Sequence, residues 1–226
     1  MAYQWDFTPV LANAPLLAQG LANTLKITGT ALSCGLVLGL AFALLRLSQH
    51  RLASWPAGFV IEVFRTTPPL VQLFWFFFAL PLVAGIEMTA FMAAVVTFSI
   101  QSAAFFAEVF RAGILSVERG QWEGARAIGM TRHQSLRRIV LPQAVKRMIP
   151  AFLERAIELM KTTTLVATIA YADLLYAANE ISQKTFRPLE TFTTVALIYF
   201  TVITAFSLLA RRLERRLSVS GEATVH

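Results

Sequence analysis

Four long stretches of the chain are apolar and carry no charged residue. They cover residues 27–45, 66–86, 88–107 and 191–210. Each contains about 20 residues, the length that an α-helix needs to cross a hydrocarbon core ~30 Å thick. The pattern therefore predicts four membrane-spanning helices.

A fifth span is predicted between residues 149 and 179, where charged residues interrupt the apolar pattern. These charged residues are Glu154, Arg155, Glu158, Lys161 and Asp173. The charge-free part, residues 162–172, is too short to cross a membrane alone. We therefore expect this helix to be shielded inside a bundle or to lie partly at the interface, and we count it as a span.

Small residues recur at every fourth position of the first predicted span. They are Ala31, Gly35, Gly39 and Ala43. Such a stripe lets two helices approach closely in a membrane. The pattern fits packing within the chain and packing against a partner equally well.

The composition agrees with a membrane protein. Hydrophobic residues make up 56% of the chain, charged residues only 15%, and the mean hydropathy is +0.60, whereas soluble domains are about 25% charged. The single Cys34 excludes an internal disulfide, and three scattered histidines form no metal-binding pattern. We therefore expect neither a disulfide scaffold nor a metal site.

The basic residues are concentrated on one side of the predicted membrane. Most of them lie between the third and fourth spans or directly after the first and last spans. Because cytoplasmic loops carry such an excess, we expect the N-terminus outside and the C-terminus in the cytoplasm. This distribution explains the net charge of +7 without a nucleic-acid partner. The first fifteen residues contain no Lys or Arg, so no cleaved signal peptide is expected.

The segment between the third and fourth spans is too polar to cross a membrane, yet it has a helical pattern. Residues 121–128 predict a short helix that stops at Gly129, because glycine readily takes the left-handed conformation of a helix C-terminus. Thr131 and Gln134 have the spacing of a capping box that opens a second helix. We expect Pro142 to end or redirect this second helix. A hairpin of this kind docks on anionic lipid or on a protein, and the residues alone do not distinguish the two.

Several polar or helix-breaking residues are predicted at membrane depth. Glu62 and Arg65 are three positions apart, and an ion pair between them is preferred over a gating role. Pro68 and the following proline free backbone carbonyls, so they mark either a structural kink or a functional bend. Gln72 and Gln101 are suited to hydrogen bonds between helices.

One run of residues makes the chain recognisable. Glu123-Gly124-Ala125, three residues, Gly129, nine residues and then Ile139-Val140-Leu141-Pro142 resembles the signature loop of ATP-binding-cassette importer permeases, written EAA-x3-G-x9-I-x-L-P. The departure is Gly124, where alanine is usual.

Other segments are similar to the polar amino acid permeases of the same class. They are residues 20–28, 35–48, 64–72 and 161–165. Thr66 replaces the glycine of the family pattern, and Thr162 replaces its acidic residue. The resemblance covers roughly residues 19–212.

The resemblance implies an all-α integral membrane protein with five transmembrane helices, the type I importer permease fold, and cytoplasmic coupling helices. It implies a permease domain over residues 19–212, between an extracytoplasmic tail (1–18) and a cytoplasmic tail (213–226). The implied location is the cell inner membrane.

The implied function is transport rather than catalysis. The chain lacks the phosphate-loop pattern G-x-x-x-x-G-K-[ST], so we expect no cofactor on it and ATP binding on a separate ATPase subunit. The implied partners are ATPase subunits, a second permease subunit (identical or related), an external substrate-binding protein and membrane lipid.

The resemblance also implies roles for individual residues. The residues expected to couple the permease to the ATPase are Glu123, Gly124, Ala125, Gly129, Ile139, Leu141 and Pro142. The candidates for the translocation path are Arg65, Pro68, Gln72, Gln101, Lys161, Thr162 and Asp173, because polar and ionisable groups inside a membrane are functional candidates.

The substrate is expected to be a polar amino acid. Thr162, in place of an acidic residue, argues against a cationic substrate. Asp173 in the run Ala-Asp-Leu-Leu is similar to acidic amino acid permeases, which gives a slight preference for glutamate and aspartate. The alternatives are a permease for an osmolyte or a sulfur compound, a secondary transporter or channel subunit, and a membrane-bound enzyme. A secondary transporter would need internal repeats or carboxylates in broken helices, and an enzyme would need a nucleophile–base or metal constellation.

Overall fold

The computed structural model describes residues 3–48 and 50–218, with only the backbone given for residues 213 and 215–218. The helical elements of this part of the chain are α1 (Thr8–Ala12), α2 (Ala14–Arg46), α3 (Arg51–Thr66), α4 (Pro69–Phe74), the π-helical turn η1 (Trp75–Ala79), α5 (Leu80–Ala84), α6 (Ala90–Leu115), α7 (Arg119–Ala127), α8 (Arg132–Ser135), the π-helical turn η2 (Leu136–Val140), α9 (Leu141–Thr162), the 3₁₀ segment η3 (Thr163–Ile169), α10 (Leu174–Thr185) and α11 (Pro188–Ser218).

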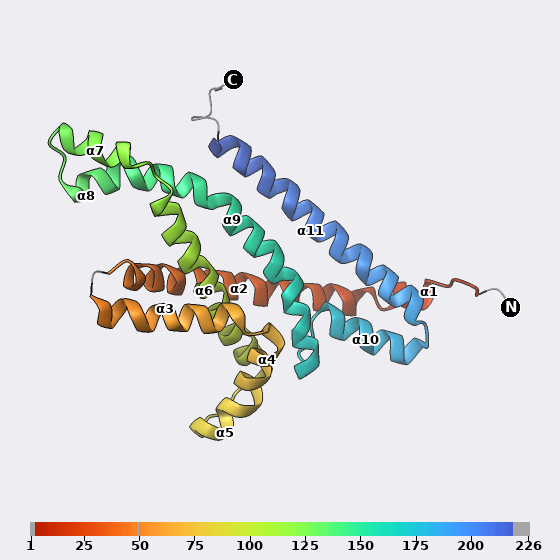
Figure 1. Ribbon diagram of the computed structural model, residues 1–226. Coiled ribbons are helices and arrows are strands. Elements are labelled where there is room, and N and C mark those ends of the chain that lie inside the picture. Colours follow the sequence, from red (N-terminus) through yellow and green to blue (C-terminus); the bar gives the residue numbers. More distant parts are fainter. Residues whose placement is uncertain (1–2, 49, 219–226) are drawn as a thin grey trace.

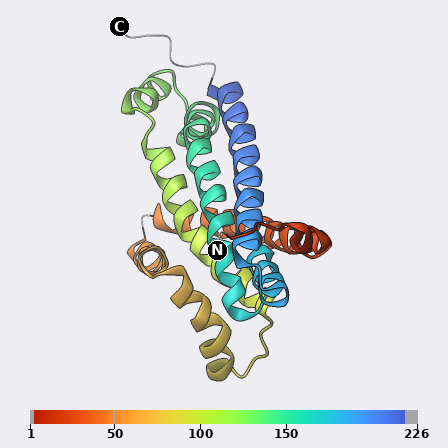
Figure 2. The same ribbon diagram turned by 90° about the vertical axis from the view of Figure 1, so that its right-hand side faces the viewer.

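Helices α6, α9 and α11 stand side by side, and α2 crosses them (Figures 1 and 2). Helix α3 folds back along the C-terminal half of α2, and an arm made of α4, η1 and α5 projects from the bundle (Figure 1). The short helices α7 and α8 form a protrusion beyond the end of α6. The main core lies between α2, α4, α6, α9 and η3, where Ile27, Leu73, Phe98, Leu159 and Val166 are fully buried.

The predicted all-α membrane fold is confirmed. Helices α2, α6 and residues 188–212 of α11 are each long and apolar enough to cross a membrane. Helices α3 and α4–α5 meet this criterion only as a pair bent by 108°, which gives up to four spans by length and composition. Helix α9 is outside this set because charges interrupt it, so its membrane crossing stays a prediction.

The small-residue stripe of α2 packs against α6 of the same chain. A Cβ atom added to Gly35 would lie 2.7 Å from the Cβ of Ser102, and one added to Gly39 would lie 2.9 Å from the carbonyl oxygen of Ala103. Ala31 and Ala43 are buried in the same contact region. Of the two expectations for the stripe, packing within the chain is therefore the one observed.

The bend between α3 and α4 falls at Pro68. Thr67 is extended (φ −81°, ψ 135°), as expected for a residue that precedes proline. The side-chain amide of Gln72 donates hydrogen bonds to the carbonyl oxygens of Phe64 (3.0 Å) and Thr67 (2.9 Å). Gln72 thus satisfies carbonyl groups that the break in the helix leaves free.

The N-terminal segment is held against the start of α11 by a buried carboxylate. Glu190 has no exposed surface, and it accepts hydrogen bonds from the Tyr3 hydroxyl (2.6 Å), the Asp6 backbone N–H (3.0 Å) and Arg187 (3.2 Å). The bond to Glu190 raises the pKa of Tyr3 above its ordinary value. These contacts fix the N-terminal segment, which precedes α2, to the start of α11 at one corner of the fold.

Candidate functional site

The protrusion formed by α7 and α8 contains the sharp turn that the sequence predicts. Helix α7 ends in a Schellman motif, in which the N–H of Gly129 bonds to the carbonyl of Arg126 (2.9 Å) and the N–H of Met130 to that of Ala125 (3.0 Å). Gly129 has φ +79°, in the left-handed region that favours glycine. Its predicted role as the helix stop is confirmed.

The predicted capping box is also confirmed. The Thr131 hydroxyl accepts a bond from the Gln134 backbone N–H (3.3 Å), and the Gln134 side chain accepts one from the Thr131 N–H (2.9 Å). These two bonds satisfy N–H groups at the start of α8. The turn between α7 and α8 is therefore fixed on both sides by local hydrogen bonds.

Of the two expectations for Pro142, that it ends the second helix is wrong. Pro142 lies in the first turn of α9, and the chain stays helical from Arg132 to Thr162. A proline inside a helix lacks an N–H and crowds the preceding turn. The π-helical turn η2 directly before it, closed by a bond from the Leu141 N–H to the Leu136 carbonyl, changes the hydrogen-bond register and accommodates the ring.

A second π-helical turn also precedes a proline in this chain. The π-helical turn η1 is closed by a bond from the Leu80 N–H to the Trp75 carbonyl and is followed by Pro81. In both places the proline lies two residues after the end of the π-turn. At these two prolines the chain thus stays helical after a wider preceding turn.

The protrusion is anchored to the spans through an apolar cluster. Val117, Val140, Ala144 and Met148 are buried there, and Trp122 packs against them. Ala125 is buried as well, whereas Glu123, Gly124 and Gly129 are exposed. Ile139 is half-buried and Leu141 and Pro142 are exposed where η2 leads into α9. Most of the predicted coupling residues are therefore exposed on the protrusion and at its junction with α9, and Ala125 and Ile139 face inward or partly inward.

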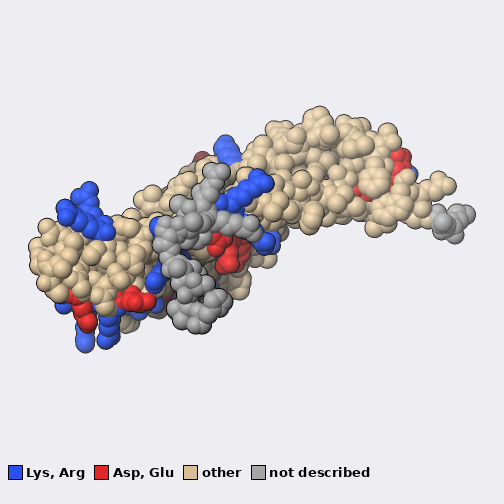
Figure 3. Space-filling view, turned by 90° about the horizontal axis from the view of Figure 1, so that it is seen from above, with Lys and Arg blue, Asp and Glu red and all other residues tan. Residues whose placement is uncertain are grey.

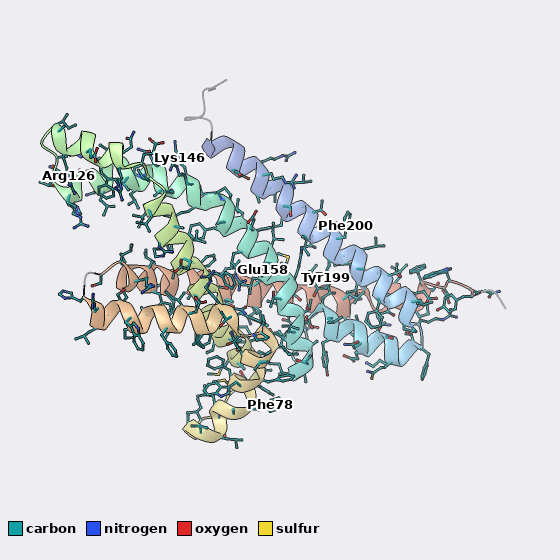
Figure 4. The ribbon with its side chains drawn as sticks, viewed as in Figure 1. Phe78, Arg126, Lys146, Glu158, Tyr199 and Phe200 are labelled. Carbon is teal, nitrogen blue, oxygen red and sulfur yellow. The ribbon has the colours of Figure 1, made fainter. Side chains whose placement is uncertain are left out.

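Basic side chains surround this end of the molecule. In Figure 3 Lys and Arg gather over the half that carries α7 and α8, and the half toward the N-terminus is mostly uncharged. Figure 4 marks Arg126 and Lys146 on the protrusion and the start of α9. Both residues are exposed.

A buried polar network joins α6 to α9. The Arg155 guanidinium, 5% exposed, donates to the side-chain oxygen of Gln101 (3.0 Å) and pairs with Glu158 (2.9 Å). It also lies over the Phe105 ring, 4.2 Å from the ring centroid. Arg155 is named above only as a charge that interrupts the fifth span and is absent from the predicted site residues, although its i, i+3 spacing from Glu158 is visible in the sequence.

Arg65 contributes to the same region from α3. Its guanidinium lies 5.6 Å from the centroid of the Phe105 ring. The preferred ion pair between Glu62 and Arg65 is not formed among the residues that the structure describes. A groove of about 430 Å³ runs beside Arg65 and Phe105 toward Arg147.

The remaining path candidates lie elsewhere. Pro68 is exposed and Gln72 is buried at the α3–α4 bend. Lys161 is exposed at the end of α9, and the hydroxyl of the half-buried Thr162 bonds to the Glu158 carbonyl (2.9 Å). The structure therefore brings Arg65 and Gln101 together around Phe105 and leaves these other candidates apart.

Asp173 is fully buried, between α2 and α10. One of its carboxylate oxygens accepts a bond from the Tyr176 N–H (2.8 Å), which caps the start of α10, and the other has no hydrogen-bond partner. The Leu174 N–H bonds to the Thr24 hydroxyl (3.2 Å). A Cβ atom on Gly20 would lie 2.8 Å from the Asp173 carbonyl oxygen, so only glycine fits there.

An all-helical bundle with apolar spans and a basic, capped protrusion defines a membrane transport subunit. The chain belongs to the family of binding-protein-dependent transport system inner membrane components, which it matches over residues 35–219. Within that family it is a permease subunit of an amino acid ABC importer, a multi-pass component of the inner membrane.

Several relatives match almost the whole chain. It is 35% identical to the arginine transport system permease protein ArtQ of Bacillus subtilis (strain 168), over 94% of this chain and 97% of that protein. It is 36% identical to the glutamate/aspartate import permease protein GltK of Escherichia coli O157:H7, over 95% and 99%. It is also 36% identical to the glutamine transport system permease protein GlnP of Escherichia coli (strain K12), over 96% and 99%.

Solved structures show the same fold. A chain from the crystal structure of an amino acid ABC transporter with histidines superposes with a TM-score of 0.90 at 38% identity, covering 95% of this chain and 100% of that chain. A chain of the MetNI methionine ABC transporter in an inward-facing conformation superposes with a TM-score of 0.75 at 21% identity, covering 90% and 96%.

Proposed function

We propose that this permease forms a translocation path for polar amino acids together with a second permease subunit, identical or related. Separate ATPase subunits bind and hydrolyse ATP and dock on the protrusion of α7 and α8, and an external binding protein delivers the substrate. Glutamate and aspartate are the preferred substrates. The observation that carries the proposal is the exposed, locally fixed turn at Gly129, in a protrusion that Trp122 anchors to the start of α9.

The coupling residues fall into two groups: those that contact the ATPase, and those that connect the protrusion to α9. Glu123, Gly124 and Gly129 are exposed and can touch the ATPase, whereas Ala125 is buried. Ile139, Leu141 and Pro142 lie where the protrusion continues into α9 without a break. A displacement of the protrusion is therefore passed to α9 through a continuous helix.

The path candidates divide according to whether their polar atoms are already engaged. Gln72, Gln101 and Asp173 are buried and bonded to other parts of the chain, so we assign them to the fold. Arg65 and Lys161 are exposed on this chain. An exposed charge at membrane depth is costly against lipid, which supports a path, closed by a second permease, as their environment. We place Pro68 and Thr162 beside them at the same helix ends.

The arm of α4, η1 and α5 supports pairing with a second permease. Trp75, Phe78, Leu82 and Val83 are exposed along it, and Figure 4 marks Phe78 there. The arm extends away from the rest of the chain, so its apolar surface is open to another subunit.

The proposed topology places α7, α8 and the C-terminus in the cytoplasm and the N-terminus outside. The excess of Lys and Arg around the protrusion and at the end of α11 supports it. The same orientation assigns residues 1–18 to the outside, 19–212 to the permease domain and 213–226 to a cytoplasmic tail.

The glutamate and aspartate preference rests on charge. Arg65 and Lys161 would interact favourably with a substrate that carries an additional carboxylate, and Thr162 offers no acidic partner to a cationic side chain. The relatives carry names for arginine, glutamate/aspartate and glutamine transport.

The test is uptake by proteoliposomes that contain this chain, its ATPase, the second permease and the binding protein. We expect ATP-dependent accumulation of labelled glutamate that excess unlabelled aspartate suppresses and excess arginine does not. Suppression by arginine alone would contradict the substrate assignment. Accumulation by the chain without the ATPase would contradict the proposed mechanism.

A further inference from the structure

A groove of about 530 Å³ opens at the corner between the end of α2 and the start of α3. Its lining residues are Arg46, Arg51, Leu52, Ser54, Trp55 and Pro56. This corner lies at the same end of the molecule as α7 and α8 (Figure 1). None of the residues assigned above to coupling or to the path lines it.

Arg46 is held in place within this corner. Its guanidinium lies over Gly58, where an added Cβ atom would come within 2.8 Å of a terminal nitrogen of Arg46. The Ser54 hydroxyl donates to the Arg46 carbonyl (3.0 Å), and the Arg46 guanidinium contacts the Ser54 carbonyl and hydroxyl at 3.4 Å. Gly58 and Ser54 therefore fix the direction of the guanidinium.

Within the described part of the chain, no ion pair engages the two arginines of the groove. The sequence contains no Asp or Glu from Arg46 to Ile61. Neither Arg46 nor Arg51 belongs to an ion pair among the residues that the structure describes. Two guanidinium groups line the groove without a carboxylate, which favours an anionic ligand.

The rest of the groove is apolar and strongly exposed. Leu52 is 94% exposed and Trp55 73% exposed, and the Trp55 ring stacks on Phe59 at 6.1 Å. Exposed tryptophan beside arginine at the end of a span is typical of the boundary between headgroups and acyl chains. Basic pockets between helices at this level bind anionic lipid headgroups.

We infer that this groove binds one anionic phospholipid, with its phosphate between Arg46 and Arg51 and its acyl chains along Leu52, Trp55 and Phe59. The combination of two unneutralised guanidinium groups with an adjoining aromatic surface matches both parts of such a lipid. A soluble phosphate would use only the first part.

Trp55 allows a direct test with brominated lipids, which quench tryptophan fluorescence on contact. The assembled importer is reconstituted in phosphatidylcholine vesicles with a minority of phosphatidylglycerol, and either lipid is brominated in turn. The signal of Trp55 is the difference between the wild-type protein and Trp55→Phe. We expect brominated phosphatidylglycerol, at equal bromine content, to quench this signal more than brominated phosphatidylcholine does.

Three variants and one control decide the outcome. Arg46→Gln with Arg51→Gln should remove the excess quenching, and Gly58→Leu should reduce it by displacing the Arg46 guanidinium without removing a charge. Arg212→Gln, which removes an exposed arginine from the end of α11, should leave it unchanged. If the double variant fails to assemble, Arg51→Gln alone, at an exposed position, replaces it in the test. This single variant should lower the excess quenching by brominated phosphatidylglycerol.

Equal quenching by the two lipids, or full excess quenching in the arginine variants, would overturn the inference. Loss of the excess on addition of inorganic phosphate, at constant ionic strength, would assign the groove to a soluble anion instead and would also overturn it.

Discussion

Arg155 is the charged residue among the buried residues of α9. A charged group removed from water is costly unless it is paired and hydrogen-bonded, and Arg155 is 5% exposed. The side-chain oxygen of Gln101 accepts a hydrogen bond from the Arg155 guanidinium, the Glu158 carboxylate pairs with it, and the face of the Phe105 ring lies against it. Gln101 and Phe105 belong to α6, so the guanidinium fixes the position of α9 on α6.

Replacement of Gln101 by leucine should destabilise the chain. The substitution removes the acceptor of a buried guanidinium N–H, and an unsatisfied buried group costs about 1–3 kcal/mol, or more when it is charged. Unfolding of the purified protein in detergent, followed by circular dichroism, measures the loss. Gln19→Leu, at an exposed position of α2, is the matched control, and an equal effect of both variants would refute the role of Gln101.

At the scale of residues, the sequence predicts local contacts and misses distant ones. The capping box of Thr131 and Gln134 and the helix stop at Gly129 depend on residues only a few positions apart, so their spacing is readable. Gln101 and Arg155 are 54 positions apart. Their contact depends on how α6 and α9 pack, which no local pattern encodes.

At the scale of elements, the contact between α2 and α6 organises the bundle. Gly35 and Gly39 bring the two backbones so close that even a methyl group has no room. Without water in the membrane core, such close packing replaces the hydrophobic effect as the force that joins helices. The fit of α2 on α6 is therefore a main determinant of stability.

Gly39→Ala should lower the stability of the chain, whereas Gly29→Ala on the same helix should not. The new methyl group at position 39 would meet the Ala103 carbonyl at 2.9 Å and the Phe106 Cβ at 2.7 Å, and no atom lies within 4 Å of the corresponding position at Gly29. Overpacking of this kind costs about 1–3 kcal/mol. The midpoint of thermal unfolding in detergent measures the difference. Equal midpoints for the two variants would contradict the claim that the close contact between α2 and α6 at Gly39 determines stability.

The sequence predicts which segments are apolar helices better than where the helices end. The charge-free stretches correspond to α2, the arm after the bend, α6 and α11, but charges at Glu62 and Arg65 hide the continuation of the helix back to Arg51. Proline ordinarily ends a helix, and the π-helical turn that accommodates Pro142 has no recognisable sequence pattern. The length of a charge-free stretch thus indicates where a span lies. Where the helix begins and ends depends also on how the backbone adjusts at prolines, which the sequence does not show.

At the scale of the whole molecule, the two ends differ in charge: one is strongly basic and the other is mostly uncharged. One end carries the basic protrusion of α7 and α8 and the arginine-lined groove at α2–α3. The other end carries the Glu190 carboxylate with Tyr3 and Arg187 as partners. This asymmetry agrees with the positive-inside rule and is the basis of the proposed topology.

Cysteine accessibility tests this topology. In a Cys34→Ala background, which removes the exposed native cysteine, single cysteines at Arg137 and Arg212 should react only with a reagent on the cytoplasmic side. Cysteines at Glu87 and Lys184 should react only from outside. Reaction of positions 137 and 184 from the same side would mean that α9 does not cross the membrane.

The central claim is that the protrusion of α7 and α8 couples ATP hydrolysis to transport, and the turn at Gly129 tests it most directly. Valine at φ +79° is strained by about 1–2 kcal/mol or more, and no side chain lies within 4 Å to clash with it, so the effect is confined to the turn. Gly124→Ala, at an open helical position of the same protrusion and matching the family pattern, is the control.

The decisive measurement is ATP-driven amino acid uptake by the reconstituted importer, with the amount of ATPase that co-purifies determined for each variant. We predict that Gly129→Val inserts in the membrane and pairs with the second permease, yet loses uptake, through loss of ATPase binding or of its stimulation by substrate. Gly124→Ala should retain uptake. Wild-type uptake by Gly129→Val with normal ATPase binding would contradict the account and would leave lipid, not the ATPase, as the surface on which the protrusion docks.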